Sequence, residues 1–232
     1  MMFDIPTFYS KQYFLEQIKK LLIKNNIKKG GRVRLSVFRS GNGTYIPNTN
    51  SPSFLIEANE INNNEYVINE KGLTIDIFND LKKNHSILSS LKTSNSLEYV
   101  LPSIFAKNNG FDDCLLLNNN GHIIESTNSN VFIVINKVLY TPPISDGCVG
   151  GVTRMNLINL LVKNKAVVYE SNLNAQHLLS ADEILLTNTI QGISWVSSFK
   201  NKRYFNNVGK QLLNDLNKEV FSCQLDSKES LI

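Results

Sequence analysis

The sequence predicts a mixed α/β fold of the α+β kind, in which helices alternate with short strands and hairpins. Several segments repeat their apolar residues every three to four positions, as amphipathic helices do. Many shorter runs alternate polar and apolar residues, or are continuously apolar between Asn- and Gly-rich turns, as strands are. The 232 residues, 42% of them hydrophobic, are enough to bury a sizeable core without disulfide bonds.

The N-terminal part of the chain predicts a helix followed by strands. The expected elements are a helix at residues 12–27, ended by Gly30-Gly31, and strands at 32–39, 54–58 and 73–78. Segment 80–91 shows neither the helical nor the strand periodicity of apolar residues, and we expect an interdomain linker there. This gives a small N-terminal domain at residues 1–84, a linker at 85–91 and a large domain at 92–232.

The large domain predicts helices interspersed with a meander of short strands. A stripe of apolar residues from Leu97 to Phe105 predicts a helix that faces the core. The other expected helices are 152–162, 175–179 and 208–220, and the expected strands are 114–117, 123–124, 131–135, 138–140, 167–169, 184–186 and 193–196.

Charge and composition exclude several classes of function. The net charge is +4 and the basic residues are scattered, so no nucleic-acid partner is expected, and pairs such as Lys82-Lys83 predict solvated faces. Cys114, Cys148 and Cys223 have no metal-ligand spacing and form no closed disulfide set, which favours a reducing compartment and no metal. With no apolar run long enough for a membrane helix and no signal peptide, we expect a cytoplasmic protein without a membrane partner.

A Gly-rich turn leads into the helix expected at 152–162. Gly150-Gly151 precede Val152 and Thr153, and unpaired N–H groups at a helix start, together with the helix dipole, favour an anion such as a phosphate. Thr153 adds a hydroxyl donor. An ordinary connection between a strand and a helix explains the same residues, and both interpretations stay open at this point.

Two further residues are candidates for chemistry. Glu125 ends a short apolar strand and begins the polar run Glu125-Ser126-Thr127-Asn128-Ser129-Asn130, a pattern that marks either a site or a solvent loop. Lys92 lies between the expected linker and the next helix, where it is either a surface residue or a nucleophile. No serine-hydrolase elbow is present, and the three histidines have no metal-binding spacing.

In order and spacing, these features resemble the fold-type IV class of pyridoxal-phosphate enzymes, which includes class IV aminotransferases and aminodeoxychorismate lyases. The resemblance covers residues 30–200 best. The matching stretches are Leu91-Lys92-Thr93-Ser94-Asn95-Ser96-Leu97, Glu125 with Ser126 to Phe132, Tyr140-Thr141-Pro142, Gly151-Val152-Thr153-Arg154, and Ala181-Asp182-Glu183 leading to Thr187-Asn188-Thr189.

The resemblance implies the fold, the cofactor and the roles of particular residues. The fold would be the two-domain, D-amino-acid aminotransferase-like fold, with pyridoxal 5'-phosphate as cofactor. Lys92 would form the Schiff base and act as general acid/base, and Glu125 would accept the pyridine N–H. The residues implied for the cofactor phosphate are Val152, Thr153 and Thr189, and those implied for the substrate carboxylate are Arg34 and Arg39.

The implied activity is amino-group transfer between a small amino acid and a 2-oxo acid in a homodimer. Members of the class usually begin with further strands and a helix that carry an arginine for the cofactor phosphate. This chain starts near the end of that helix, so we expect an N-terminally truncated small domain. Two alternatives stay open: a lyase that releases pyruvate from 4-amino-4-deoxychorismate to form 4-aminobenzoate, and a catalytically inactive relative.

Overall fold

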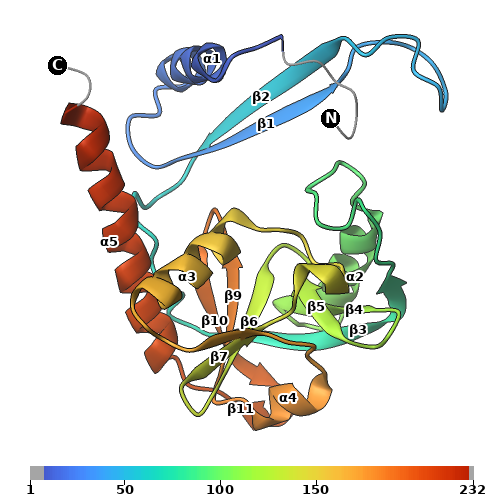
Figure 1. The fold of residues 1–232 in the computed structure, drawn as a ribbon, viewed down its shortest axis with the longest axis vertical. Helices are drawn as coiled ribbons and strands as arrows, with labels where there is room; N and C mark the ends of the chain where they lie inside the picture. The colour runs from blue at the N-terminus through green and yellow to red at the C-terminus, as the bar shows by residue number, and fades with distance from the viewer. Residues whose placement is uncertain (1–7, 230–232) are drawn as a thin grey trace. The chain divides into compact units, whose positions relative to one another are not determined.

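The chain forms two compact units, Met1–Glu65 and Tyr66–Ile232 (Figure 1). The computed structural model describes residues 8–229, with side chains as far as residue 220. The units divide earlier than the linker expected at 85–91. The reason is that β3 (Leu73–Lys83) pairs in parallel with β4 (Asp113–Asn118) and with β10 (Gly192–Phe199), so β3 belongs to the sheet of the second unit.

The first unit contains a helix and a long hairpin, as the sequence predicts. Its elements are α1 (Lys11–Lys24), β1 (Gly31–Arg39) and β2 (Pro52–Glu60), and the two strands pair antiparallel along their full length. The side chain of Ser10 caps α1 by accepting the N–H of Tyr13. Rings of Tyr9, Tyr13 and Phe14 pack on Phe54 of β2, which joins the apolar face of the helix to the hairpin.

The second unit is built on a closed strand barrel. Following the hydrogen-bonded pairs, β10 adjoins β3, then β4, β5 and β6, and β9 pairs with both β6 and β10, which closes the ring. Closure removes the exposed edges that an open sheet would leave. The remaining strands extend from this ring: β7 and β8 beyond β6, and β11 beyond β10. Their bounds are β5 (Ile123–Ser126), β6 (Asn130–Ile135), β7 (Val138–Thr141), β8 (Val168–Glu170), β9 (Glu183–Asn188) and β11 (Lys202–Arg203).

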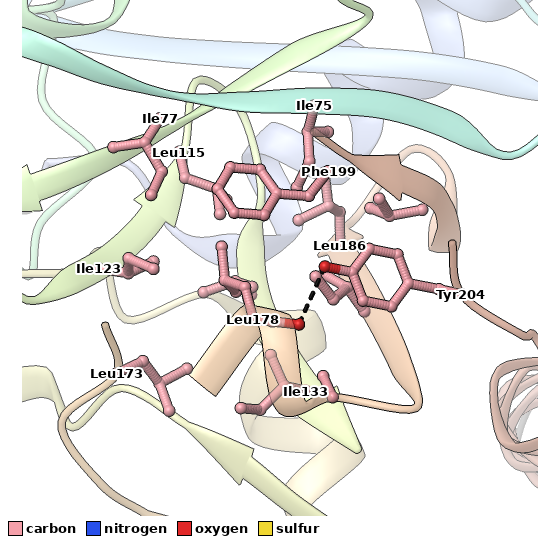
Figure 2. Packing of buried hydrophobic residues seen from close by; sticks show 14 of the residues in the cluster. Ile75, Ile77, Leu115, Ile123, Ile133, Leu173, Leu178, Leu186, Phe199 and Tyr204 are labelled. Atoms are coloured by element: carbon pink, nitrogen blue, oxygen red, sulfur yellow. Dashed lines mark hydrogen bonds between the residues drawn. The ribbon is translucent and has the colours of Figure 1, made fainter. Parts of the chain in front are cut away.

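The barrel interior is filled by a cluster of apolar side chains to which all the ring strands contribute (Figure 2). Along β6, Val131 and Ile133 belong to this interior cluster, whereas Phe132 and Val134 belong to a second cluster outside. This alternation is the two-residue period of a strand. The hydroxyl of Tyr204 donates to the backbone oxygen of Leu178 at 2.9 Å, so that this interior phenol is paired (Figure 2).

The helices of the second unit are α2 (Leu97–Asn108), η1 (Ile144–Asp146), α3 (Val152–Lys163), α4 (Ala175–Ser180) and α5 (Asn207–Glu229). Leu157 and Leu161 of α3 and Leu213 of α5 join the outer cluster beside β6 and β9, as their periodicity predicts. Leu178 of α4 instead belongs to the interior cluster. Among the described residues, no helix combines the length and hydropathy needed to cross a membrane.

The prediction that the apolar stripe of α2 faces the core is wrong for most of its residues. Phe105 packs on Phe78, and Pro102 and Ala106 are buried. The other apolar side chains of the stripe are exposed in the single chain: Leu97, Val100, Leu101 and Ile104. Periodicity shows that a helix has an apolar face, but it does not distinguish a face covered by the chain itself from one left open.

Glu183 is a buried carboxylate that caps α5. Its oxygens accept the N–H groups of Val208 at 2.8 Å and Gly209 at 2.9 Å. We expect Glu183→Ala to lower the free energy of unfolding by about 2 kcal/mol, because two helix-start donors lose a charged acceptor. Urea unfolding measures this loss. Glu70→Ala, at an exposed position, is the control, and an equal loss in both variants would contradict the capping role.

Candidate active site

Glu125 lies near the end of β5 and is only 3% exposed. Its Oε1 accepts hydrogen bonds from Lys83 Nζ at 2.6 Å and from the Tyr99 hydroxyl at 2.9 Å. Its Oε2 accepts the backbone N–H of Val149 at 2.8 Å. The carboxylate therefore connects β3, α2 and the loop before α3. In the polar run that begins at Glu125, residues Ser126, Ser129 and Asn130 are also buried, whereas Asn128 is exposed.

Lys83, the last residue of β3, is the cation of this network. Its ammonium group donates to Glu125, to the Tyr99 hydroxyl at 2.7 Å and to the backbone oxygen of Ser89 at 3.3 Å. The residue is 2% exposed, so the expectation that the pair Lys82-Lys83 forms a solvated face is wrong for Lys83. A buried cation needs a partner charge, and Glu125 supplies it.

Tyr99 and Cys148 are uncharged neighbours of Glu125. Burial, reinforced by the Glu125 carboxylate, raises the pKa of Tyr99 well above its ordinary value. The phenol therefore stays protonated, and its O–H donates a hydrogen bond to Glu125. Burial also raises the pKa of the Cys148 thiol to about 11, although the nearby charge of Arg154 opposes this shift. Cys148 is therefore a neutral thiol near pH 7 and not a nucleophile.

The helix that the Gly-rich turn was expected to start does begin at Val152. Its N-cap is Gly151, and no side chain caps it. The backbone N–H groups of Val152 and Thr153 have no acceptor among the described residues, and the Thr153 side chain is 5% exposed. These unpaired donors lie at the positive end of the helix dipole, an arrangement that favours an anion.

The start of α3 and Glu125 are joined by Asn130. The Asn130 amide donates to the backbone oxygen of Val149 at 2.8 Å, while the N–H of Val149 donates to Glu125. Gly151 packs against the Asn130 side chain so closely that a Cβ there would overlap its oxygen. Position 151 therefore requires glycine for a steric reason.

Lys92 lies outside this buried network. Its side chain is exposed, in the irregular segment between Leu91 and α2. That segment is connected to the start of α3 because the N–H of Gly150 donates to the Ser90 oxygen at 2.9 Å. The structure thus places Lys92 two residues beyond a contact with the Gly-rich turn, but not in contact with Glu125.

The remaining predicted residues lie in two places. Thr189 follows β9 with an exposed side chain, and its backbone oxygen accepts the Tyr66 hydroxyl at 3.1 Å. Arg34 and Arg39 belong to β1 of the first unit. Arg34 forms an exposed ion pair with Glu57, opposite it on β2, at 2.5 Å, and Arg39 donates to Asn50 at 2.9 Å.

Sequence reasoning missed Lys83 and Tyr99. Lys83 follows a strand-like run and Tyr99 lies on a helix, and neither local pattern distinguishes a buried polar residue from a surface one. Their partner Glu125 is 42 positions from Lys83. Among the described residues, no group of three His, Cys, Asp or Glu side chains could hold a metal ion.

The site combines an uncapped helix start with a carboxylate that can accept another hydrogen bond. An ionised carboxyl group has about four lone-pair positions, and three are used here, two on Oε1 and one on Oε2. The fold therefore brings a buried carboxylate with a remaining acceptor position and an uncapped helix start together, through Val149 and Asn130.

Comparison with known proteins identifies the family. A sequence model described as Amino-transferase class IV matches residues 2–199, and the chain belongs to this family. The chain is 27% identical over 202 residues to a probable branched-chain-amino-acid aminotransferase of Aquifex aeolicus, across 85% of this chain and 64% of that protein. It is 26% identical over 208 residues to the aminodeoxychorismate lyase of Bacillus subtilis, across 87% and 69% of the two chains.

Solved structures share the fold. A Legionella pneumophila protein provisionally named 4-amino-4-deoxychorismate lyase has a TM-score of 0.81 at 28% identity, covering 92% of this chain and 79% of that chain. The pyridoxal-phosphate form of the branched-chain amino acid aminotransferase of Thermobaculum terrenum has a TM-score of 0.81 at 22% identity, covering 93% and 72%. The matches span 34% to 64% of the length of the first curated relatives.

Proposed function

We propose that this protein is a pyridoxal-phosphate-dependent aminotransferase that moves an amino group between a small amino acid and a 2-oxo acid. The observation that carries the proposal is the buried carboxylate of Glu125, linked through Val149 and Asn130 to the uncapped start of α3. Membership of the class IV family and similarity to aminotransferases support it.

Each proposed residue has a role that its environment supports. Pyridoxal phosphate, when bound, supplies an electron sink that stabilises negative charge at the substrate α-carbon. Glu125 would hold the ring nitrogen and its proton through the remaining lone pair of Oε2. Val152 and Thr153 would bind the phosphate through backbone N–H groups, and Thr189 would add a hydroxyl donor.

Lys92 would hold the cofactor covalently and move the proton at the substrate α-carbon. An amine reacts with an aldehyde only when it is unprotonated. The Lys83 amine is engaged by three hydrogen-bond acceptors, one of them a carboxylate, whereas Lys92 has no such partner within the part of the chain that the structure describes. Arg34 and Arg39 are the proposed contacts of the substrate carboxylate, which a guanidinium binds with two parallel hydrogen bonds.

A 4-amino-4-deoxychorismate lyase is the second candidate. Similarity to proteins of that name in Bacillus subtilis and Legionella pneumophila favours it. The two reactions differ in their products. The aminotransferase would transfer an amino group to 2-oxoglutarate, whereas the lyase would release pyruvate and 4-aminobenzoate. Assays of the same purified protein with both substrate sets distinguish them.

We also propose that the protein is a cytoplasmic homodimer. The exposed apolar face of α2, with Leu97 69% and Ile104 50% exposed, is the kind of surface that a subunit contact covers. Light scattering coupled to gel filtration measures the mass of the protein in solution. A mass of one chain would contradict the dimer.

Absorption and reduction test the cofactor proposal. The purified protein is mixed with pyridoxal phosphate, its visible spectrum is recorded, and borohydride reduction followed by peptide mapping locates the modified lysine. We expect a protein-dependent absorption band and a label on the Lys92 peptide. A folded protein without such a band would contradict the proposal and favour the inactive relative.

A substitution at the helix start tests the phosphate site. In Gly151→Ala the new Cβ overlaps the Asn130 side chain, so either that buried side chain or the start of α3 with the N–H groups of Val152 and Thr153 must shift. We expect the dissociation constant for pyridoxal phosphate to rise about tenfold, equivalent to about 1.4 kcal/mol. Gly150→Ala is the control, because its Cβ would meet Ser90 and Ile144 atoms only at 3.4 and 3.9 Å. Equal affinities of the two variants would contradict the expected role of the Gly151 turn in phosphate binding.

A further inference from the structure

Lys83 occupies a position at which one side chain contacts three parts of the proposed site. Its ammonium group bonds Glu125 of β5, the hydroxyl of Tyr99 on α2, and the backbone oxygen of Ser89. Ser89 belongs to the segment that leads to Lys92, and the adjacent Ser90 accepts the N–H of Gly150. One cation therefore connects the carboxylate to the segment that carries the proposed anchoring lysine.

The geometry leaves Glu125 with one defined orientation. Both side chains of the ion pair are buried, at 3% and 4% exposure, so water does not replace a lost partner. Lys83 and Tyr99 fix Oε1, and the N–H of Val149 fixes Oε2. Tyr99 keeps its proton, so Lys83 is the one cation in this set of donors, and it balances the negative charge of the carboxylate.

We propose that Lys83 is a positioning residue that holds the Glu125 carboxylate in the orientation in which it accepts a ring N–H of the cofactor. This inference rests on the proposed function, since it concerns the same site. Lys83 itself contacts neither the ring nor the phosphate in this scheme. Its effect on cofactor binding passes through Glu125, and this dependence is measurable.

A double-mutant cycle on cofactor affinity provides the test. The dissociation constant for pyridoxal phosphate is measured by fluorescence titration for the full chain and for Lys83→Met, Glu125→Gln and the double variant. We expect Lys83→Met to weaken binding by about 10- to 100-fold, by analogy with the range seen when a metal-ligating side chain loses the partner that orients it. We expect the double variant to bind as Glu125→Gln does, because the lysine has no carboxylate left to orient.

Two further variants complete the experiment. Lys83→Arg keeps the charge and should restore most of the affinity, and Lys82→Met, at the neighbouring position, should leave it unchanged. If Lys83→Met does not fold, the dissociation constants of the double variant and of Glu125→Gln are compared instead. Neither of these variants contains a carboxylate at position 125 that lacks its cation.

Each result has a distinct meaning. A further loss of affinity on adding Lys83→Met to Glu125→Gln would overturn the inference, because the lysine would then act independently of Glu125. Wild-type affinity in Lys83→Met would also overturn it, while leaving the proposed function intact. Failure of the unmodified chain to bind the cofactor would overturn both.

Discussion

Replacing Lys92 with alanine is expected to abolish covalent attachment of pyridoxal phosphate and, with it, amino transfer. No other lysine is proposed to present an unprotonated amine to the cofactor, because the ammonium of Lys83 is held by Glu125 at 2.6 Å. The measurement is mass spectrometry of the intact protein after incubation with the cofactor and borohydride reduction. We expect the whole Lys92→Ala sample to have the mass of the chain without attached cofactor.

Controls separate this result from misfolding. Lys82→Ala should retain the label, and an unchanged circular dichroism spectrum would show that Lys92→Ala folds. Because the Lys92 side chain is exposed and lies outside the helices and strands, its removal should cost little stability. A reduced cofactor found on the Lys83 peptide of Lys92→Ala would contradict the assignment of the anchoring lysine.

The second large effect is expected at Glu125. Glu125→Gln keeps the size of the side chain but removes the charge that would hold a proton on the ring nitrogen. We expect kcat for amino transfer to fall by at least about 100-fold, in line with losses seen when a preorganised electrostatic partner is removed. The cofactor should still bind, more weakly, through the phosphate site and Lys92.

Steady-state kinetics with saturating cofactor measure this effect. The matched control is Glu70→Gln, which makes the same change at an exposed carboxylate of the second unit and should leave kcat unchanged. An unchanged kcat in Glu125→Gln would remove Glu125 from the mechanism, whereas a protein that no longer folds would instead show the structural cost of leaving Lys83 without its counter-ion.

The relation between sequence and structure differs from one element to another. The start of α3 at Val152 was predicted at that residue, because a glycine pair followed by an amphipathic period is a local signal. The position of Glu125 at the end of β5 was predicted for a similar reason. The short strand β11 (Lys202–Arg203) was not predicted, because two residues give no periodicity.

The sequence by itself determined the helices, most of the strands, the family resemblance and a set of candidate residues. Each of these follows from neighbouring residues: an apolar period, a turn or a short motif. Only the tertiary structure decided that β3 belongs to the barrel, that β9 closes it, and that Lys83 and Tyr99 surround Glu125. The physical reason is that strand pairing and burial of a charge depend on residues far apart in the chain. The apolar period of α2 and the lysine pair before the expected linker are both compatible with a buried or an exposed position, and the packing around them selects between the two.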